Sequence, residues 1–160
     1  MSQSIGIDPG LTGAISLFDS QGELVDVWDM PAIQAPRGKG NIVSPQLLAD
    51  IFQNDLNASN AIETAYIEQV SAMPGQGVSS MFKFGRCAGL IEGVVAAFGI
   101  SIEYVTPQKW KKHFSLIGKD KDAARQLCLE RYPHNARLFK RKKDIGRADA
   151  VLIGQYGIFR

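Results

Sequence analysis

Short runs of apolar residues alternate along the chain with segments rich in turn formers. Five such runs have the length and β-branched content of strands, and they lie at residues 4–8, 14–18, 23–29, 65–70 and 100–105. Pro9-Gly10 ends the first of them. The tetrad Asp19-Ser20-Gln21-Gly22 is typical of a turn, so the second and third runs predict a hairpin.

Helical periodicity appears in the remaining apolar segments. Ser44-Pro45 predicts a helix start, with serine as N-cap and proline in the first turn. Further helices are expected at residues 78–98, from Thr106-Pro107, at 119–131 and from about Arg147 to Ile158. Two segments are expected to be loops: residues 31–43, with Arg37 and Lys39 near the tip, and the basic residues 132–143.

The order of these elements predicts the fold class. A hairpin followed by alternating helices and strands is typical of an α/β protein with a mixed sheet covered by helices. The 160 residues contain no repeat and no composition break, so we expect one domain over residues 1–160.

Small residues recur every fourth position in the long helix expected at 78–98. They are Gly85, Gly89, Gly93 and Ala97, and this spacing lets another backbone approach closely. The partner is either the protein's own sheet or a second copy of the chain, and the pattern alone leaves both open.

Charge is distributed unevenly along the chain. Residues 1–108 contain four basic and eleven acidic residues, whereas residues 109–160 contain fourteen basic and five acidic ones. The C-terminal third therefore faces either solvent or a polyanion such as a nucleic acid. Cys87 and Cys128 match no metal-binding spacing and are expected to be buried free thiols. Without a recognisable leader or an apolar run of membrane-spanning length, we expect a cytoplasmic protein.

Three carboxylates occupy positions where apolar residues are expected. Asp8 ends the first strand, Glu68 lies in or at the end of the fourth, and Asp149 shares a helix stripe with Leu152 and Ile153. Each has an ordinary alternative role: a turn former, an edge-strand charge, and a charge favoured by the helix dipole. Taken together, carboxylates on separate core elements indicate a site for a hard cation such as Mg²⁺. Paired divalent ions of this kind hydrolyse phosphodiesters.

Three motifs that contain these carboxylates resemble those of the RuvC family of Holliday-junction resolvases. They are Ile5-Gly6-Ile7-Asp8-Pro9-Gly10-Leu11-Thr12-Gly13, Ile67-Glu68-Gln69-Val70 and Ala148-Asp149-Ala150-Val151-Leu152-Ile153. The resemblance covers nearly the whole chain and implies an RNase H-like fold with a five-stranded sheet in the order 3-2-1-4-5. It also implies a homodimer that nicks opposed strands of branched DNA with two magnesium ions, which manganese can replace, leaving 5′-phosphate and 3′-hydroxyl ends.

The chain departs from the family pattern at two places. The family carries a fourth acidic or histidine ligand three residues before the last aspartate, where this chain has Gly146. Asp144 is the candidate replacement, or else the N-cap of the last helix. The family's junction-opening aromatic residue follows Glu-Gln-Val, where this chain has Ser71, and Met73, Phe82 or Phe84 are the candidate substitutes. The longer segment 31–43 suggests a phage-type or divergent member, which would act in the host cytoplasm if viral.

Basic residues that flank the carboxylates are the candidate phosphate contacts. In the resemblance, Lys111 takes the position of a family lysine near the scissile phosphate, and Lys119 or Lys121 that of a second. The full set of candidate DNA-binding residues is Arg37, Lys39, Lys83, Arg86, Lys109, Lys111, Lys112, Lys119, Lys121, Lys140, Arg141, Lys142 and Lys143.

Other functions remain possible at this point. A nuclease that prefers forks, flaps or RNA–DNA hybrids would have the same core. A nucleic-acid binding module without catalysis would lack a carboxylate, and all three are present. The actin and sugar-kinase group shares an Asp-x-Gly-x-Thr strand end, but it needs two related domains, for which this chain is too short.

Overall fold

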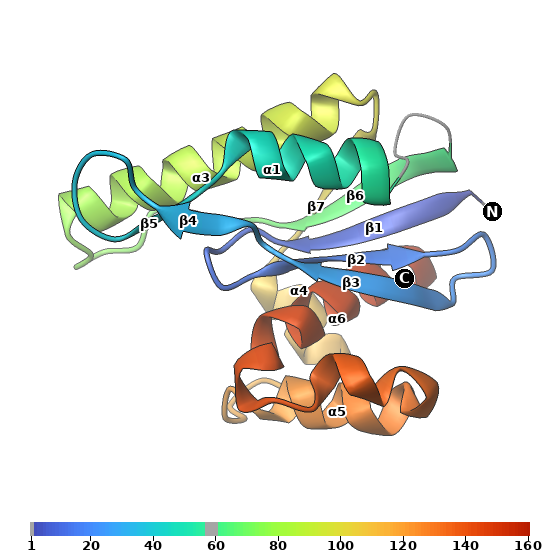
Figure 1. The fold of residues 1–160 in the computed structure, drawn as a ribbon. Helices are drawn as coiled ribbons and strands as arrows, with labels where there is room; N and C mark the ends of the chain where they lie inside the picture. Colours follow the sequence, from blue (N-terminus) through green and yellow to red (C-terminus); the bar gives the residue numbers. More distant parts are fainter. Residues whose placement is uncertain (1, 57–60) are drawn as a thin grey trace.

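The structure, a computed structural model, describes residues 2–56 and 61–160. Its centre is a five-stranded sheet (Figure 1). The strands of this sheet are β1 (Gln3–Asp8), β2 (Ala14–Phe18), β3 (Leu24–Asp29), β6 (Ile62–Glu68) and β7 (Ser101–Val105). They lie in the order β3-β2-β1-β6-β7, so the expected RNase H-like order is confirmed once the separate β4–β5 hairpin is left out.

The sheet is mixed, as the hairpin and crossover pattern predicts. β1, β2 and β3 are joined by antiparallel pairing, whereas β6 runs parallel to both β1 and β7. In the parallel pair, Ile7 lies opposite Ile67. Asp8 and Glu68, the next residue of each strand, therefore reach the same edge of the sheet.

Helices cover both faces of the sheet (Figure 1). One face carries α1 (Pro45–Asp50), its π-helical extension Ile51–Asp55, and α3 (Val78–Ala97). The other face carries α4 (Pro107–His113), α5 (Ala123–Arg131) and α6 (Ile145–Phe159). Ser44 caps α1 as predicted, since its hydroxyl accepts a hydrogen bond from the Leu47 amide at 3.3 Å.

Helix α6 lies unusually close to the sheet because glycines face each other across the interface. A Cβ atom on Gly6 would lie 2.6 Å from the Gly154 nitrogen, so neither position has room for a side chain. The Ser16 hydroxyl adds a polar link, because it contacts the carbonyl oxygens of Gly6 at 3.2 Å and Ala150 at 2.9 Å. The last helix is thereby held rigidly over β1.

Both expected loops contain regular structure. Residues 31–43 form a two-stranded hairpin of β4 (Ala32–Gln34) and β5 (Asn41–Val43). β-Branched residues pair along its strands, and Gly38 and Gly40 supply the positive φ angles of its tip. Residues 132–143 include two 3₁₀ segments, Pro133–Phe139 and Lys142–Asp144.

One predicted helix is shorter than expected. The segment 119–131 becomes helical only at Ala123. The Asp120 carboxylate accepts a hydrogen bond from the Asp122 amide at 2.9 Å, which favours a turn over the first helical residues. Lys119 and Lys121 therefore lie in a loop.

The small residues of α3 face solvent. Gly85, Gly89 and Gly93 are exposed, and a Cβ atom on any of them would meet nothing within 4 Å. Packing of this stripe against the protein's own sheet is therefore excluded. Both cysteines are buried and free, as predicted. Within residues 2–56 and 61–160, no helix is long and apolar enough to cross a lipid bilayer.

Candidate active site

Strand alternation directs two carboxylates toward α6. Ile5, Ile7 and Ile67 belong to the core between the sheet and α3, so the residues that alternate with them point to the opposite face. Asp8 and Glu68 are such residues, and both are partly buried at the end of their strands. The Asp8 Oδ1 atom also accepts a hydrogen bond from the Gly10 amide at 3.2 Å, which orients the carboxylate.

The third carboxylate comes from α6. Asp149 lies directly before the buried Ala150 and about one helical turn after Gly146. At Gly146 the helix contacts the β1–β2 loop. It is partly buried and lies on the side of the helix that faces the sheet end. The structure therefore brings together Asp8, Glu68 and Asp149, although they are up to 141 positions apart in the sequence.

The three carboxylates influence one another's pKa. Burial raises the pKa of Asp8 to about 6, and the negative charge of Glu68 adds to the increase. Burial also raises the pKa of Asp149 to about 8, with further contributions from Asp8 and Glu68. Burial raises the pKa of Glu68 as well. Such a group of mutually repelling, partly buried carboxylates needs a positive charge to stay ionised together.

Two residues of α4 partly offset this repulsion. The buried indole of Trp110 donates a hydrogen bond from Nε1 to the Glu68 Oε2 atom at 2.7 Å, which lowers the pKa of Glu68. Lys111 lowers the pKa of all three carboxylates, so it lies beside them, where the sequence predicts a lysine. The sequence did not predict a site role for Trp110, because no local pattern in residues 107–113 links this tryptophan to Glu68.

The donor set suits a hard divalent cation, since Mg²⁺ binds carboxylate oxygens and keeps several waters. In the described part of the chain, however, nowhere do three His, Cys, Asp or Glu side chains already stand close enough to hold one ion. The three carboxylates must therefore come closer together to share one ion.

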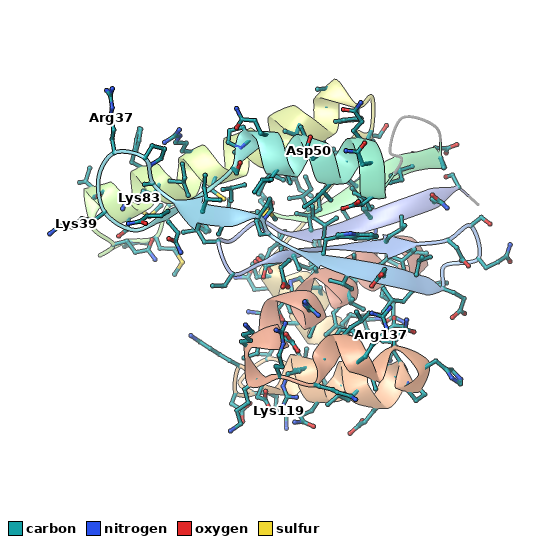
Figure 2. The ribbon with its side chains drawn as sticks, in the orientation of Figure 1. Arg37, Lys39, Asp50, Lys83, Lys119 and Arg137 are labelled. Carbon is teal, nitrogen blue, oxygen red and sulfur yellow. The ribbon has the colours of Figure 1, made fainter. Side chains whose placement is uncertain are left out.

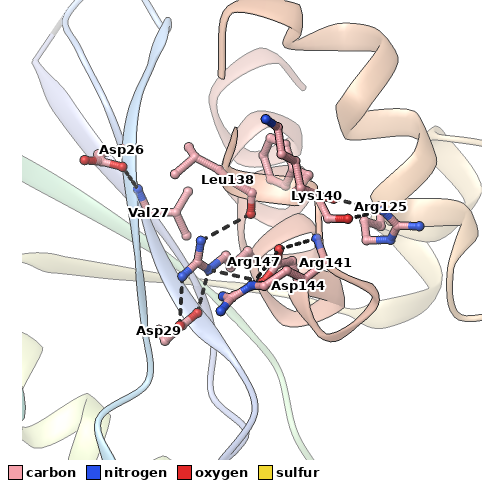
Figure 3. A network of polar contacts seen from close by, with 10 residues as sticks. Asp26, Val27, Asp29, Arg125, Leu138, Lys140, Arg141, Asp144 and Arg147 are labelled. Atoms are coloured by element: carbon pink, nitrogen blue, oxygen red, sulfur yellow. Dashed lines mark hydrogen bonds and ion pairs between the residues drawn. The ribbon is translucent and has the colours of Figure 1, made fainter. Parts of the chain in front are cut away.

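Asp144, the predicted fourth ligand, is held by two arginines. Its buried carboxylate forms an ion pair with Arg141 at 2.8 Å and lies 3.8 Å from the Arg147 guanidinium (Figure 3). Burial acts to raise the pKa of Asp144, but the hydrogen bonds and charges of Arg141 and Arg147 outweigh it, so the pKa is lowered. Asp144 does precede α6 at the N-cap position, but its side chain makes no capping hydrogen bond there. The role of Asp144 as a metal ligand stays a prediction, and in this structure its carboxylate is bound by Arg141.

The Asp144 network still positions the site, because it fixes the start of α6. Arg147 binds both carboxylate oxygens of Asp29 in β3, at 2.7 and 2.9 Å, and the Leu138 carbonyl oxygen at 3.3 Å (Figure 3). The buried Arg125 holds the neighbouring carbonyl oxygen of Phe139 at 2.9 Å. The first turn of α6, and with it Asp149, is thus anchored to the sheet and to the preceding basic segment.

Gly146 is excluded as a ligand position by its surroundings. A Cβ atom there would lie 1.9 Å from the Thr12 carbonyl oxygen and 3.1 Å from the Gly13 Cα atom. The contact lets the start of α6 press against the loop that follows Asp8. A close backbone contact therefore occupies the position where the resemblance implies a fourth ligand.

A cavity of about 410 Å³ beside Asp149, which we call the Asp149 pocket, gathers several predicted phosphate contacts. Lys111, Lys119 and Lys121 line it together with Trp110 and Asp149. Three lysines beside clustered carboxylates are typical of a site that binds a phosphodiester next to a metal. The loop that replaces the first turn of the predicted 119–131 helix carries Lys119 and Lys121 to the rim of this pocket.

The other predicted DNA-binding residues fall into two regions. Arg37, Lys39, Lys83 and Arg86 gather around the β4–β5 hairpin and α3, far from Lys119 and Arg137 in the α5 layer (Figure 2). Lys109, Lys112, Lys140, Lys142 and Lys143 are exposed on the α4–α6 side. The Arg141 side chain is half-exposed and forms an ion pair with Asp144, so part of its charge is already neutralised within the protein.

The raised pKa values predict how pH affects the metal-free protein. Between pH about 8 and about 6, folded Asp149 takes up a proton, whereas unfolded Asp149, with its ordinary pKa of 3.8, stays ionised. Stability should therefore increase as pH falls through this window, by on the order of 1–2 kcal/mol. Urea unfolding in a chelator at the two pH values measures the difference, which Asp149→Asn should abolish and Asp50→Asn should leave intact. Equal stability of the wild-type protein at both pH values would contradict the carboxylate cluster.

Known proteins resemble this chain in sequence and in fold. The chain is 28% identical over 156 residues to the chloroplastic Holliday junction resolvase MOC1 of Chlamydomonas reinhardtii. That alignment covers 84% of this chain but only 17% of the relative, so the chain spans about a sixth of that protein. No protein-family model matches the sequence.

Solved structures of RuvC share the whole fold. Thermus thermophilus RuvC in complex with a Holliday junction substrate superposes with a TM-score of 0.60 at 14% identity, covering 99% of this chain and 94% of RuvC. A second Thermus thermophilus RuvC structure gives a TM-score of 0.58 at 15% identity, with 98% and 93% of the two chains covered. The chain is therefore RuvC-like: it has the RNase H-like fold of the RuvC structures and a sequence similar to that of a Holliday junction resolvase.

Proposed function

We propose that the protein is a divalent-metal-dependent endonuclease that resolves four-way DNA junctions. The observation that carries this function is the meeting of Asp8, Glu68 and Asp149 beside a lysine-lined pocket, on the fold of RuvC. Residues 1–160 then form one nuclease domain. Its expected products carry 5′-phosphate and 3′-hydroxyl ends, which can be rejoined without further processing.

Each residue of the site has a distinct role in this proposal. Asp8, Glu68 and Asp149 hold two Mg²⁺ ions, which, when bound, supply activation of the attacking water and stabilisation of the departing 3′ oxygen. Trp110 orients Glu68 through its indole N–H, so that the carboxylate keeps one fixed oxygen and one free oxygen. Lys111, Lys119 and Lys121 bind the phosphates next to the scissile bond and compensate their charge.

Paired nicks require two active sites on one junction, so we propose a homodimer. The exposed glycines of α3 suit a helix-to-helix contact, because a Cβ atom added at any of them would meet no described atom within 4 Å, which leaves their backbone open to a partner. Light scattering of the full chain should give twice the 17.5 kDa monomer mass. Gly89→Leu should lower the measured mass toward that of the monomer. The control is Leu47→Gln, which changes an exposed residue on α1 and should leave the mass unchanged.

The decisive experiment compares Mg²⁺-dependent cleavage of four DNA substrates: a four-way junction, a fork, a flap and a linear duplex. Junction resolution predicts symmetrical nicks in the four-way junction and slow cutting of linear duplex. Preferred cutting of the fork or flap would instead identify a branched-DNA nuclease of relaxed specificity. Absence of metal-dependent cleavage on all four would overturn the proposed activity.

Binding to the junction is expected to depend steeply on salt. Phosphate contacts by lysine and arginine release counterions, so affinity should fall by at least about 10²-fold between about 50 and about 200 mM salt. Fluorescence anisotropy with a labelled junction and the Asp8→Asn protein measures this without cleavage. A flat response would exclude recognition dominated by phosphates.

A further inference from the structure

The chain between α4 and α5, residues 115–122, forms a loop beside the Asp149 pocket, and we call it the α4–α5 loop. Its middle residues line the pocket, from Leu116 to Lys121. Ser115 and Gly118 have positive φ angles, of 58° and 74°. Such angles are uncommon for any residue other than glycine, so the conformation of Ser115 needs support from the surrounding structure.

Backbone hydrogen bonds give that support by closing the loop into two successive turns. The Leu116 amide donates to the Lys111 carbonyl oxygen at 2.7 Å, the bond of a Schellman motif, with Ser115 in the left-handed conformation. Next, the Lys119 amide donates to the Leu116 carbonyl oxygen at 3.1 Å, and Gly118 has the positive φ that the third position of a type II turn requires. The α4–α5 loop is therefore formed before any ligand binds, which reduces the entropy cost of binding.

The second turn carries Ile117 at its tip. The Ile117 side chain is 57% exposed, whereas the preceding Leu116 packs partly buried against the core on the α4–α6 side. Single exposed apolar side chains are ordinary on protein surfaces, so exposure alone assigns no role to Ile117. Its position does, because Ile117 lines the same cavity of about 410 Å³ as Asp149 and Lys119. A branched alkyl side chain therefore lies among the groups that are expected to hold the scissile phosphate.

Charged and apolar side chains of the pocket suit different parts of a DNA strand. Lysines bind phosphate oxygens, which every nucleotide carries, so they do not distinguish one sequence from another. An alkyl side chain gains nothing from a phosphate, because the phosphate would lose hydration beside it without a hydrogen bond in return. Isoleucine packs instead against the carbon atoms of sugars and bases, and proteins use such side chains to separate neighbouring bases. Ile117 is therefore suited to a contact that varies with the nucleotide.

We propose that Ile117 contacts the sugar and base next to the scissile phosphate and makes the cleavage rate depend on the DNA sequence at that position. This assignment rests on the proposed function, because the carboxylates define which phosphate is scissile. A base that unstacks readily admits the side chain at a lower cost in free energy, so positions with such bases are cut faster. Lys111, Lys119 and Lys121 contribute the same affinity to every sequence.

Cleavage of a four-way junction with a mobile homologous core tests this assignment, because branch migration offers every position of the core to the enzyme. The wild-type protein should cut its best position at least about tenfold faster than its poorest, and Ile117→Thr should narrow this ratio to about threefold or less. Ile117→Val keeps the apolar contact and should keep the preference. The matched control is Val25→Thr, which makes an exposed β-branched residue of β3 polar and should also keep it. Even cutting by the wild type, or an unchanged ratio in Ile117→Thr, would overturn the role of Ile117.

The salt dependence of junction binding separates this contact from the phosphate contacts. Ile117→Thr removes no charge, so in the Asp8→Asn protein it should leave the slope of log affinity against log salt concentration unchanged. Lys119→Gln in the same background should reduce that slope by about one. A slope reduced equally by Ile117→Thr would mean that the residue acts through the lysines, and it would overturn a direct contact.

Photo-crosslinking locates the contact without cleavage. Benzoylphenylalanine in place of Ile117 reacts with nearby C–H bonds, so in the Asp8→Asn protein it should crosslink to nucleotides at the crossover, whereas the same replacement of Val25 should not. Crosslinks confined to the outer parts of the arms, or none, would overturn the contact. A wild-type protein that cleaves junctions without a preference would refute only the role of Ile117. A crosslink at the crossover by a protein that cleaves no branched DNA would refute only the nuclease.

Discussion

Asp8→Asn should slow cleavage of a four-way junction by at least about 10³-fold while leaving the protein folded and able to bind DNA. The substitution removes one negative charge from the metal site, and loss of several kcal/mol of transition-state stabilisation by the ions corresponds to a rate change of this size. Asparagine keeps an oxygen for the hydrogen bond from the Gly10 amide, so the loop after β1 should hold its shape. Single-turnover cleavage measures the effect, and anisotropy measures binding.

The matched control for this variant is Asp50→Asn, which neutralises an exposed aspartate on α1 (Figure 2). It changes the net charge equally and should cleave at the wild-type rate. If Asp8→Asn cut junctions as fast as Asp50→Asn, Asp8 would have no part in metal binding.

Gly146→Ala should both destabilise the protein, by about 2–3 kcal/mol, and reduce cleavage. The new methyl group would lie 1.9 Å from the Thr12 carbonyl oxygen, a backbone atom that cannot rotate away. The start of α6 must therefore move from the β1–β2 loop, which separates Asp149 from Asp8. Urea unfolding reports the first effect and single-turnover cleavage the second, because rates in enzymes are sensitive to such displacements.

Gly93→Ala is the same chemical change at a helical glycine in open space. Among the described residues of a single copy of the chain, no atom lies within 4 Å of its added Cβ, so the higher helix propensity of alanine should stabilise the monomer by about 0.5–1 kcal/mol. If Gly146→Ala and Gly93→Ala changed the free energy of unfolding in the same direction, the contact between α6 and the β1–β2 loop would be contradicted.

The three carboxylates were accessible from the sequence because each interrupts a regular apolar pattern. Asp8 and Glu68 follow strand residues that alternate into the core, and Asp149 follows the helical stripe of Leu152 and Ile153. The strand order could be predicted only from the family resemblance. Periodicity indicates which face of the sheet a residue lies on, but it does not indicate which strands are neighbours. The observed order and the parallel register of β1 and β6 complete the convergence.

The side-chain contacts around the carboxylates could not be predicted from the sequence. Asp144 was a reasonable candidate ligand by its distance from Asp149, but its partner is Arg141, three residues earlier, within a 3₁₀ turn that the basic composition of 132–143 did not reveal. The bond from Trp110 to Glu68 joins residues 42 positions apart. Side-chain partners of this kind depend on tertiary placement, which local pattern does not encode.

The hairpin at residues 31–43 was also missed, for a different reason. Prolines and glycines outweighed two short apolar pairs, Ile33 with Ile42 and Ala32 with Val43, whose segments become strands only by pairing with each other. The loop prediction did identify Arg37 and Lys39 as a basic tip. The cavity of about 650 Å³ between the hairpin and α3 could not be predicted, because it depends on where the hairpin packs against the helix.

The most direct measurement is the anomalous scattering of manganese in crystals of the full chain grown with Mn²⁺. Anomalous peaks should appear among the carboxylates of Asp8, Glu68 and Asp149 in the wild-type protein and be lost or reduced in Asp8→Asn. Peaks elsewhere in the molecule, or none at these carboxylates under saturating Mn²⁺, would contradict a metal-dependent nuclease site at this end of the sheet.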